Sequence, residues 1–180
     1  MNPLRTLIQT IDKINYWVGE VLSYLLFVMF ALILLEVLLR YVFNSPTVWA
    51  NELTQYLFGA YAVLSGGYIL LSGGHVNVDI IYSHLSPRTK AGLDIFTSLL
   101  FFLFCGMLFY YGGSLAMESL SIWEHSESAW NPPLYPVKMM IPIGSLLVLL
   151  QGVNKLILDI YIVLGYEPPV VHATEAGDSL

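Results

Sequence analysis

Hydrophobic residues gather in four long runs that short polar stretches separate, at about residues 21–43, 48–71, 92–117 and 137–164. Each run has the roughly 20 mainly apolar residues that a helix needs to cross a hydrocarbon core about 30 Å thick. Helices are expected because an open strand in lipid leaves backbone N–H and C=O groups without partners. The pattern predicts an all-α membrane protein: one domain over residues 1–165 with four transmembrane helices.

The later runs begin with residue types that favour a helix N-terminus: Ser45 and Pro46, Ser86 and Pro87, and Pro136. A serine accepts a hydrogen bond from the first free N–H groups of a helix, and proline suits the first turn because its missing N–H is not needed there. Pro142 lies inside the fourth run, where we expect a kink.

Composition supports a membrane protein. The chain has 180 residues, of which 57% are hydrophobic and 11% charged, whereas soluble domains carry about 25% charged residues. The net charge of −6 argues against a nucleic acid or an anionic lipid surface as partner. Residues 1–20 are mixed and do not read as a cleavable signal, because the run that follows is too long. Residues 166–180 are polar, and we expect a short disordered end.

The basic residues outside the runs favour one orientation. They lie before the first run and between the second and third runs: Arg5, Lys13, Arg88 and Lys90. The connections 44–47 and 118–136 carry no lysine or arginine. Because cytoplasmic segments are enriched in these residues, we expect both termini in the cytoplasm. Arg40 lies near the outer end of the first run and departs from this bias.

Three charged residues near the first turn need an explanation. Glu36 and Arg40 are four residues apart and share a helix face, and Glu52 follows just after the turn. A carboxylate as deep as Glu36 is costly in lipid without a partner. We interpret the three as an ion-pair clamp, Glu36–Arg40–Glu52, between the first two helices. The alternatives are a proton or ion relay at Glu36, or simple snorkelling of Arg40 to the surface.

The second run carries a stripe of polar and small residues at helical spacing: Trp49, Glu52, Gln55, Gly59, Ala62 and Gly66. Small residues at this spacing let helices approach closely in lipid. The stripe is suited either to packing inside this chain or to docking another membrane subunit. Gln151 and Asn154 in the fourth run are polar at membrane depth, and we expect them to cross-link helices rather than to bind substrate.

Cofactor and enzyme chemistry find little support. His75 and Asp79 could share a helix face, with His84 nearby, but metal binding needs three or four converging ligands. None of the four histidines lies inside a run, so a haem or quinone anchor for an enzyme complex lacks axial ligands at depth. Cys105 allows no internal disulfide. We find no nucleophile–base pair or phosphate loop, and we expect neither a metal, nor a cofactor, nor an enzyme.

The stretches "EVLLRYVFNSPTVWANE", "GGYIL" and "GGHVNVDIIYSHLSPR" carry a resemblance. Over residues 10–163 the chain resembles the small membrane subunit of tripartite ATP-independent periplasmic (TRAP) transporters. That family pattern has an arginine in the first span, a tryptophan and a glutamate entering the second, and His-x-x-Val-Asp after it. The residues that match are Glu36, Arg40, Trp49, Glu52, His75 and Asp79.

The resemblance implies a non-catalytic scaffold subunit in the bacterial inner membrane. It implies packing against a large permease subunit that carries the substrate and sodium sites, and a periplasmic solute-binding protein that delivers an organic acid or related solute. The six matching residues are then structural or subunit-interface residues, and no substrate-binding residue carries over. The alternative from the residues alone is a self-sufficient four-helix exporter that uses Glu36 as its proton-coupled acid.

Overall fold

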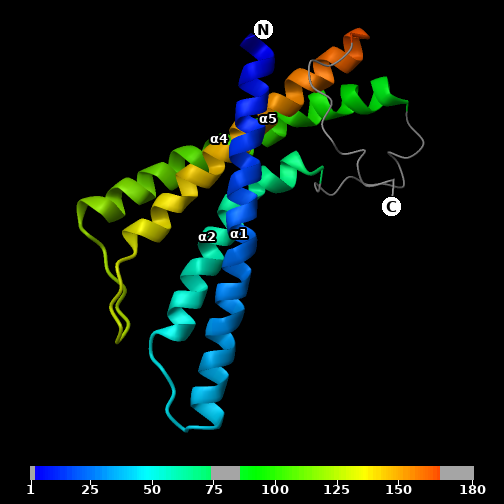
Figure 1. Cartoon of the computed structure of the whole chain (residues 1–180). Helices are drawn as coiled ribbons and strands as arrows, with labels where there is room; N and C mark the ends of the chain where they lie inside the picture. The colour runs from blue at the N-terminus through cyan, green and yellow to red at the C-terminus, as the bar shows by residue number, and fades with distance from the viewer. Residues whose placement is uncertain (1–2, 74–85, 167–180) are drawn as a thin grey trace, which may run out of the picture.

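The computed structural model describes residues 3–73 and 86–166, and this part of the chain folds into helices joined by loops (Figure 1). The helices are α1 (Pro3–Tyr41), α2 (Ala50–Leu71), α4 (Pro87–Ser121) and α5 (Tyr135–Leu164). The predicted all-α class is confirmed. In the described residues α1, α4 and α5 are long and apolar enough to cross a membrane, and α2 is less apolar. Most of the expected polar tail, residues 167–180, lies outside the described residues.

Helix α1 is longer than the run at 21–43 predicted. It has 39 residues, about 58 Å at 1.5 Å per residue. Apart from Ile11, its buried positions recur every seven residues: Ile8, Asn15, Leu22, Met29 and Glu36. A seven-residue repeat keeps one seam of a helix facing its neighbours. The seam begins well before residue 21, so the mixed N-terminal segment is a continuation of the helix.

The helix starts match the sequence in two of three cases. Ser86 caps α4, and its Oγ accepts a hydrogen bond from the N–H of Thr89 at 3.3 Å. Pro136 lies in the first turn of α5. The expected start of α2 at Ser45 and Pro46 is wrong, because Trp49 is the N-cap and makes no side-chain cap bond. The residues before Trp49 form a turn, with Asn44 at φ 50°.

Helix α5 is the centre of the arrangement. It packs against α1, α2 and α4, while α1 also lies along α2 (Figure 1). Close approach depends on glycines of α5. A Cβ at Gly144 would lie 2.6 Å from the carbonyl oxygen of Val63 in α2, and a Cβ at Gly152 would overlap the ring of Phe101 in α4. These contacts bring the helix backbones together, as expected where lipid provides no hydrophobic drive for association.

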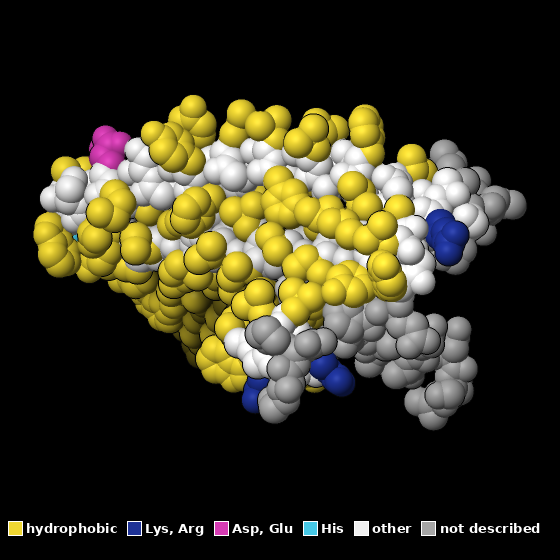
Figure 2. Space-filling model, turned by 90° about the horizontal axis from the view of Figure 1, so that it is seen from above, with side chains coloured by type: hydrophobic (Ala, Val, Ile, Leu, Met, Phe, Trp, Pro, Cys, Tyr) yellow, Lys and Arg dark blue, Asp and Glu magenta, His cyan; other side chains and the backbone are white. Residues whose placement is uncertain are grey.

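The outside of the bundle is strongly apolar. Figure 2 shows a face covered mainly by hydrophobic side chains, with the charged side chains near its edges. The most exposed large residues lie on α1 and α4, among them Phe27, Phe96, Leu99 and Phe104. Apolar surface this extensive is incompatible with water and suited to the hydrocarbon of a bilayer.

The connections and the chain ends separate to opposite ends of the bundle (Figure 1). The turn between α1 and α2 and the loop between α4 and α5 lie toward one end. The beginning of α1 and the end of α5 lie toward the other. We refer to these as the turn end and the terminal end.

Replacing Gly144 by alanine should loosen the contact between α2 and α5. The added methyl group meets a backbone carbonyl that cannot move aside without shifting a helix. We expect the free energy of unfolding to fall by about 1–3 kcal/mol, the usual cost of overpacking. Thermal unfolding in detergent measures this. The control is Gly106→Ala in α4, where a Cβ meets nothing within 4 Å; an equal loss in both variants would contradict the assignment.

Candidate functional site

The Glu36 carboxylate organises the turn end of α1. Its residue is only 4% exposed. Its Oε1 accepts hydrogen bonds from Arg40 Nε at 3.0 Å and Arg40 Nη2 at 2.5 Å. Its Oε2 accepts from the Thr47 N–H at 3.1 Å and the Thr47 hydroxyl at 2.5 Å. A buried carboxylate is tolerated when it is paired and hydrogen-bonded in this way.

These bonds fix the connection between α1 and α2. Thr47 lies eleven residues after Glu36 and across the turn. The hydroxyl of Thr47 also accepts a weaker bond, 3.4 Å, from the N–H of Ala50 at the start of α2. One side chain of α1 therefore sets both the path of the turn and the place where the next helix begins. The structure places the predicted Glu36–Arg40 pair as expected.

Glu52 binds a different part of the chain. Its carboxylate accepts hydrogen bonds from the Ser126 and Ser128 hydroxyls, each at 2.6 Å, and from the hydroxyl of Tyr56 one turn later. Both serines belong to the loop between α4 and α5. Glu52 therefore ties the start of α2 to that loop.

The predicted clamp is wrong in its third member. Arg40 forms its ion pair with Glu36, and in the described part of the chain no ion pair joins Arg40 to Glu52. The clamp assumed that α2 begins at Pro46 and runs straight back along α1. Because α2 begins at Ala50 after a longer turn, Glu52 faces the α4–α5 loop, whose hydroxyl groups satisfy it.

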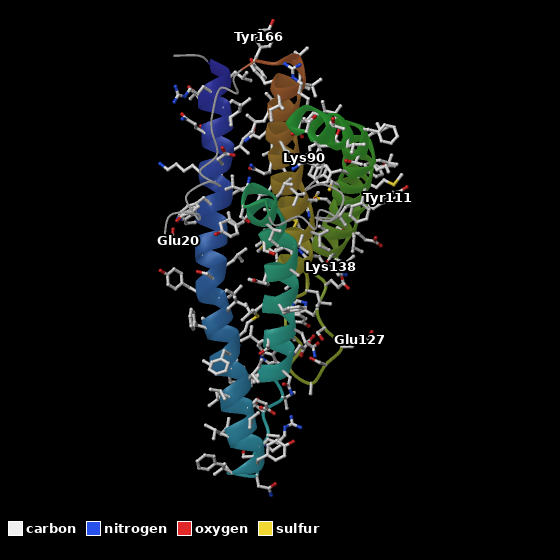
Figure 3. All side chains as sticks on the ribbon, turned by 90° about the vertical axis from the view of Figure 1, so that its right-hand side faces the viewer. Glu20, Lys90, Tyr111, Glu127, Lys138 and Tyr166 are labelled. Carbon is white, nitrogen blue, oxygen red and sulfur yellow. The ribbon has the colours of Figure 1, made fainter. Side chains whose placement is uncertain are left out.

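The loop between α4 and α5 is a compact hairpin-like structure. His125 and Pro133 form a β-bridge, and the Leu134 N–H donates to the Glu124 carbonyl at 2.9 Å. Trp130 in the loop meets Trp49, with ring centroids 6.5 Å apart. The part that carries Glu127 lies beside the first turns of α2 (Figure 3). Trp49 therefore helps to join the loop to α2 and is only partly exposed.

An ion pair closes the base of this loop. Lys138 in the first turn of α5 lies 2.5 Å from a carboxylate oxygen of Glu124. This ammonium group holds the pKa of the Glu124 carboxyl below its ordinary value of 4.5. The two basic residues at the turn end, Arg40 and Lys138, are thus both paired with acids.

A polar network joins α1 to α5 nearer the terminal end. Asn15 donates to the side-chain oxygen of Gln151 at 2.9 Å, and Gln151 donates to Asp12 at 2.9 Å. Asn154 donates to the same Asp12 oxygen at 3.1 Å. Gln151 and Asn154 therefore cross-link helices, as the sequence predicted. Hydropathy alone does not predict their partners, because it places residues 1–20 outside the first span, although Asp12 and Asn15 are three apart, like Gln151 and Asn154.

Lys155 forms a second link that sequence reading missed. Its ammonium group pairs with Asp94 of α4 and, at 3.1 Å, with Asp159 of α5. The spacing of four between Lys155 and Asp159 is a recognisable helix pair. The position of Asp94 in another helix could not be read from local spacing.

Two predicted site residues, His75 and Asp79, lie outside the described residues. Within the ranges that the structure describes, no group of three or more histidine, cysteine, aspartate or glutamate side chains is arranged to hold a metal ion. Glu36 and Glu52 both accept hydrogen bonds from side chains beyond their own helix. The geometry is that of a brace, because each carboxylate ties its helix to a neighbouring connection.

Comparison with known proteins agrees with this architecture. The family model described as "Tripartite ATP-independent periplasmic transporters, DctQ component" matches residues 12–161. The sialic acid TRAP transporter permease protein SiaT of Haemophilus influenzae (strain 86-028NP) is 28% identical over 103 residues. That alignment covers 57% of this chain and 16% of the relative, so this chain matches a small part of that relative's length.

Arg40→Ala should lower both the melting temperature and the yield of the purified chain. The change leaves the buried Glu36 carboxylate without its cation, and adding Glu36→Gln should recover part of the loss. In double-mutant cycles measured by thermal unfolding, Glu36 and Arg40 should couple by about 0.5–1 kcal/mol, since Arg40 is partly exposed. Arg40 and Glu52 should show no coupling. Equal coupling of Arg40 to both acids would restore the three-residue clamp.

The loop should respond to acid through Glu124. Because the pKa of Glu124 is lowered in the folded loop, the ion pair stabilises the loop above the ordinary value of 4.5 and is lost as pH falls through the lowered value. In a Trp17→Phe background, fluorescence of the loop tryptophans should change below pH 4.5. Lys138→Gln should move the midpoint upward. If Lys138→Gln left the pH midpoint of the fluorescence change where it was, the Glu124–Lys138 ion pair would not be what holds the loop.

Proposed function

This chain belongs to the DctQ family of TRAP transporter components and is a small, multi-pass subunit of the bacterial inner membrane, and on this premise we propose that it acts as a non-catalytic scaffold. In this role it packs against a large permease subunit and holds it in the bilayer. The large subunit carries the substrate, and the small one provides a rigid set of helices.

The observation that carries the proposal is the use of the polar side chains. Glu36 and Glu52 fix the turn end, and the Asp12–Asn15–Gln151–Asn154 network fixes the crossing of α1 and α5. Polar groups at membrane depth are costly, and in transport sites they line a pathway open to water or substrate. Here they cross-link helices, which favours rigidity over translocation.

We further propose that the helices form one domain over residues 1–165 with four crossings, including α2, and with both termini in the cytoplasm. The beginning of α1 and the end of α5 lie toward the same end of the bundle, which fits an even number of crossings (Figure 1). The basic residues at the turn end are neutralised by acids. Arg5 and Lys13 lie in the first three turns of α1, and Arg88 and Lys90 lie in the first turn of α4, toward the terminal end. This asymmetry supports a cytoplasmic terminal end.

The proposed complex imports an organic acid, or a related small solute, with sodium coupling. The relative from Haemophilus influenzae is named for sialic acid, which is a carboxylic acid, and supports this class of substrate. That relative extends far beyond the aligned part, which is compatible with a large permease partner for this chain. The acidic α4–α5 loop, with exposed Trp123 and Glu127, is suited to contact a periplasmic solute-binding protein.

The alternative is a self-sufficient exporter that uses Glu36 as its proton-coupled acid. Such an acid must exchange its partners during transport. Glu36 is buried, and both its oxygens accept hydrogen bonds from Arg40 and Thr47. This arrangement supports the scaffold over the exporter.

Reconstitution separates the two functions. The small chain should co-purify with the large permease subunit of the same transporter. Proteoliposomes that hold both, supplied with the soluble binding protein and an inward sodium gradient, should take up a member of a panel of radiolabelled carboxylic acids that includes sialic acid. The small chain alone should take up and extrude nothing. The exporter would be established instead if the chain alone transported a solute and Glu36→Gln abolished that transport while the chain stayed folded.

A further inference from the structure

The outward face of α2 differs in chemistry from the outward faces of the other helices. Its exposed positions include Asn51, Gln55, Phe58 and Ala62, and Gly59 lies among them. A Cβ built on Gly59 would meet nothing within 4 Å. We call these five residues the α2 outer face. Within the described chain, neither Asn51 nor Gln55 has a side-chain hydrogen-bond partner.

The other helices expose hydrophobic side chains over their middle parts, as contact with lipid requires. Between residues 99 and 111 of α4, every exposed position is leucine, phenylalanine, methionine or tyrosine. Between residues 24 and 38 of α1, every exposed position is tyrosine, alanine or a larger hydrophobic residue. The exposed residues of α5 from 143 onward are isoleucine, leucine and valine. Outside α2, these three stretches expose no amide side chain.

Packing inside the chain does not account for this face. Helix α2 packs against α1 and α5, and its buried residues are Ala50, Ser65, Gly67 and Leu70. Gly66 also faces inward, where a Cβ would lie 2.7 Å from Val148. The stripe read from the sequence therefore divides. Glu52 and Gly66 serve contacts within the chain, whereas Gln55, Gly59 and Ala62 point away from it.

Contact between lipid acyl chains and such a face is unfavourable. An amide group in hydrocarbon without a hydrogen-bond partner costs free energy, and lipid offers no partner. A second helix supplies both missing elements: a hydrogen-bond partner for Gln55, and a surface that approaches the backbone closely at Gly59. Helix interfaces in membranes are enriched in small and amide-bearing residues for these reasons. Among the described helices, α2 is also the one whose length and composition do not mark it as a candidate membrane span.

We propose that the α2 outer face packs against a transmembrane helix of the large permease subunit, and that α1 and α4 face lipid. The proposal rests on the scaffold function and names the surface by which the scaffold works. Gln55 donates a hydrogen bond to the partner helix, Gly59 and Ala62 allow close approach, and Phe58 fills the groove beside them. The face lies next to Trp49 and Glu52, so the brace at the turn end also holds the docking surface in place.

Two glycines give a matched test. Gly59 in α2 and Gly106 in α4 both have open space where a side chain would stand, so replacing either by leucine should leave the isolated chain folded. When each variant is co-expressed with the large subunit and purified through a tag on the small chain, Gly59→Leu should reduce recovery of the large subunit about tenfold. Gly106→Leu should leave recovery as in the unaltered chain. Loss with Gly106→Leu but not with Gly59→Leu would overturn the proposal and assign the interface to α4.

Crosslinking identifies the occupant directly. In a Cys105→Ala background, a cysteine at Ala62 should crosslink to the large subunit in membranes, and a cysteine at Leu103, exposed on α4, should not. A crosslinked dimer of the small chain through residue 62 would overturn the proposal in favour of self-association. Recovery of the large subunit with the unaltered chain is the reference. If that recovery is absent, the scaffold function itself fails; if it is present but insensitive to Gly59→Leu, only the assignment of the α2 outer face fails.

Discussion

A carboxylate buried between membrane helices needs cationic or hydrogen-bonding partners, and Glu36 shows how much of the structure follows from that constraint. Its two oxygens bind Arg40 on the same helix and Thr47 across the turn. These bonds delay the start of α2 to Ala50 and thereby turn Glu52 toward the α4–α5 loop. The Trp49–Trp130 contact then completes a continuous structure across the turn end.

Helix α5 likewise places polar side chains against partners on other helices. It contacts each of the other described helices, and three of its polar residues have cross-helix partners. Gln151 and Asn154 bind α1, and Lys155 binds α4. Polar bonds of this kind are worth little individually in membranes but fix which helix faces meet. A bundle built this way has few polar groups left to move, which suits a scaffold better than a transport pathway.

The outer surface of the bundle also differs in chemistry from one helix to another. The exposed positions in the middle of α1 and α4 are hydrophobic, as a hydrocarbon solvent requires, whereas α2 presents the amide side chains of Asn51 and Gln55. A subunit that must be soluble in lipid and also recognise one partner needs both kinds of surface. Placing the recognition face on α2 puts it beside the most strongly braced end of the bundle, where docking costs least in conformational entropy.

The sequence by itself determined the helical class, the approximate helix positions, the Glu36–Arg40 pair and the helix-linking role of Gln151 and Asn154, because hydropathy and i,i+4 spacing are local properties. It also contained the seven-residue repeat that extends α1 to Pro3. Only the tertiary structure decided the partners of Glu52, Asp12 and Asp94, and which half of the α2 stripe points outward. Those depend on where the turn ends and how helices distant in sequence cross, and a shift of a few residues in a helix start rotates every side chain to a different face.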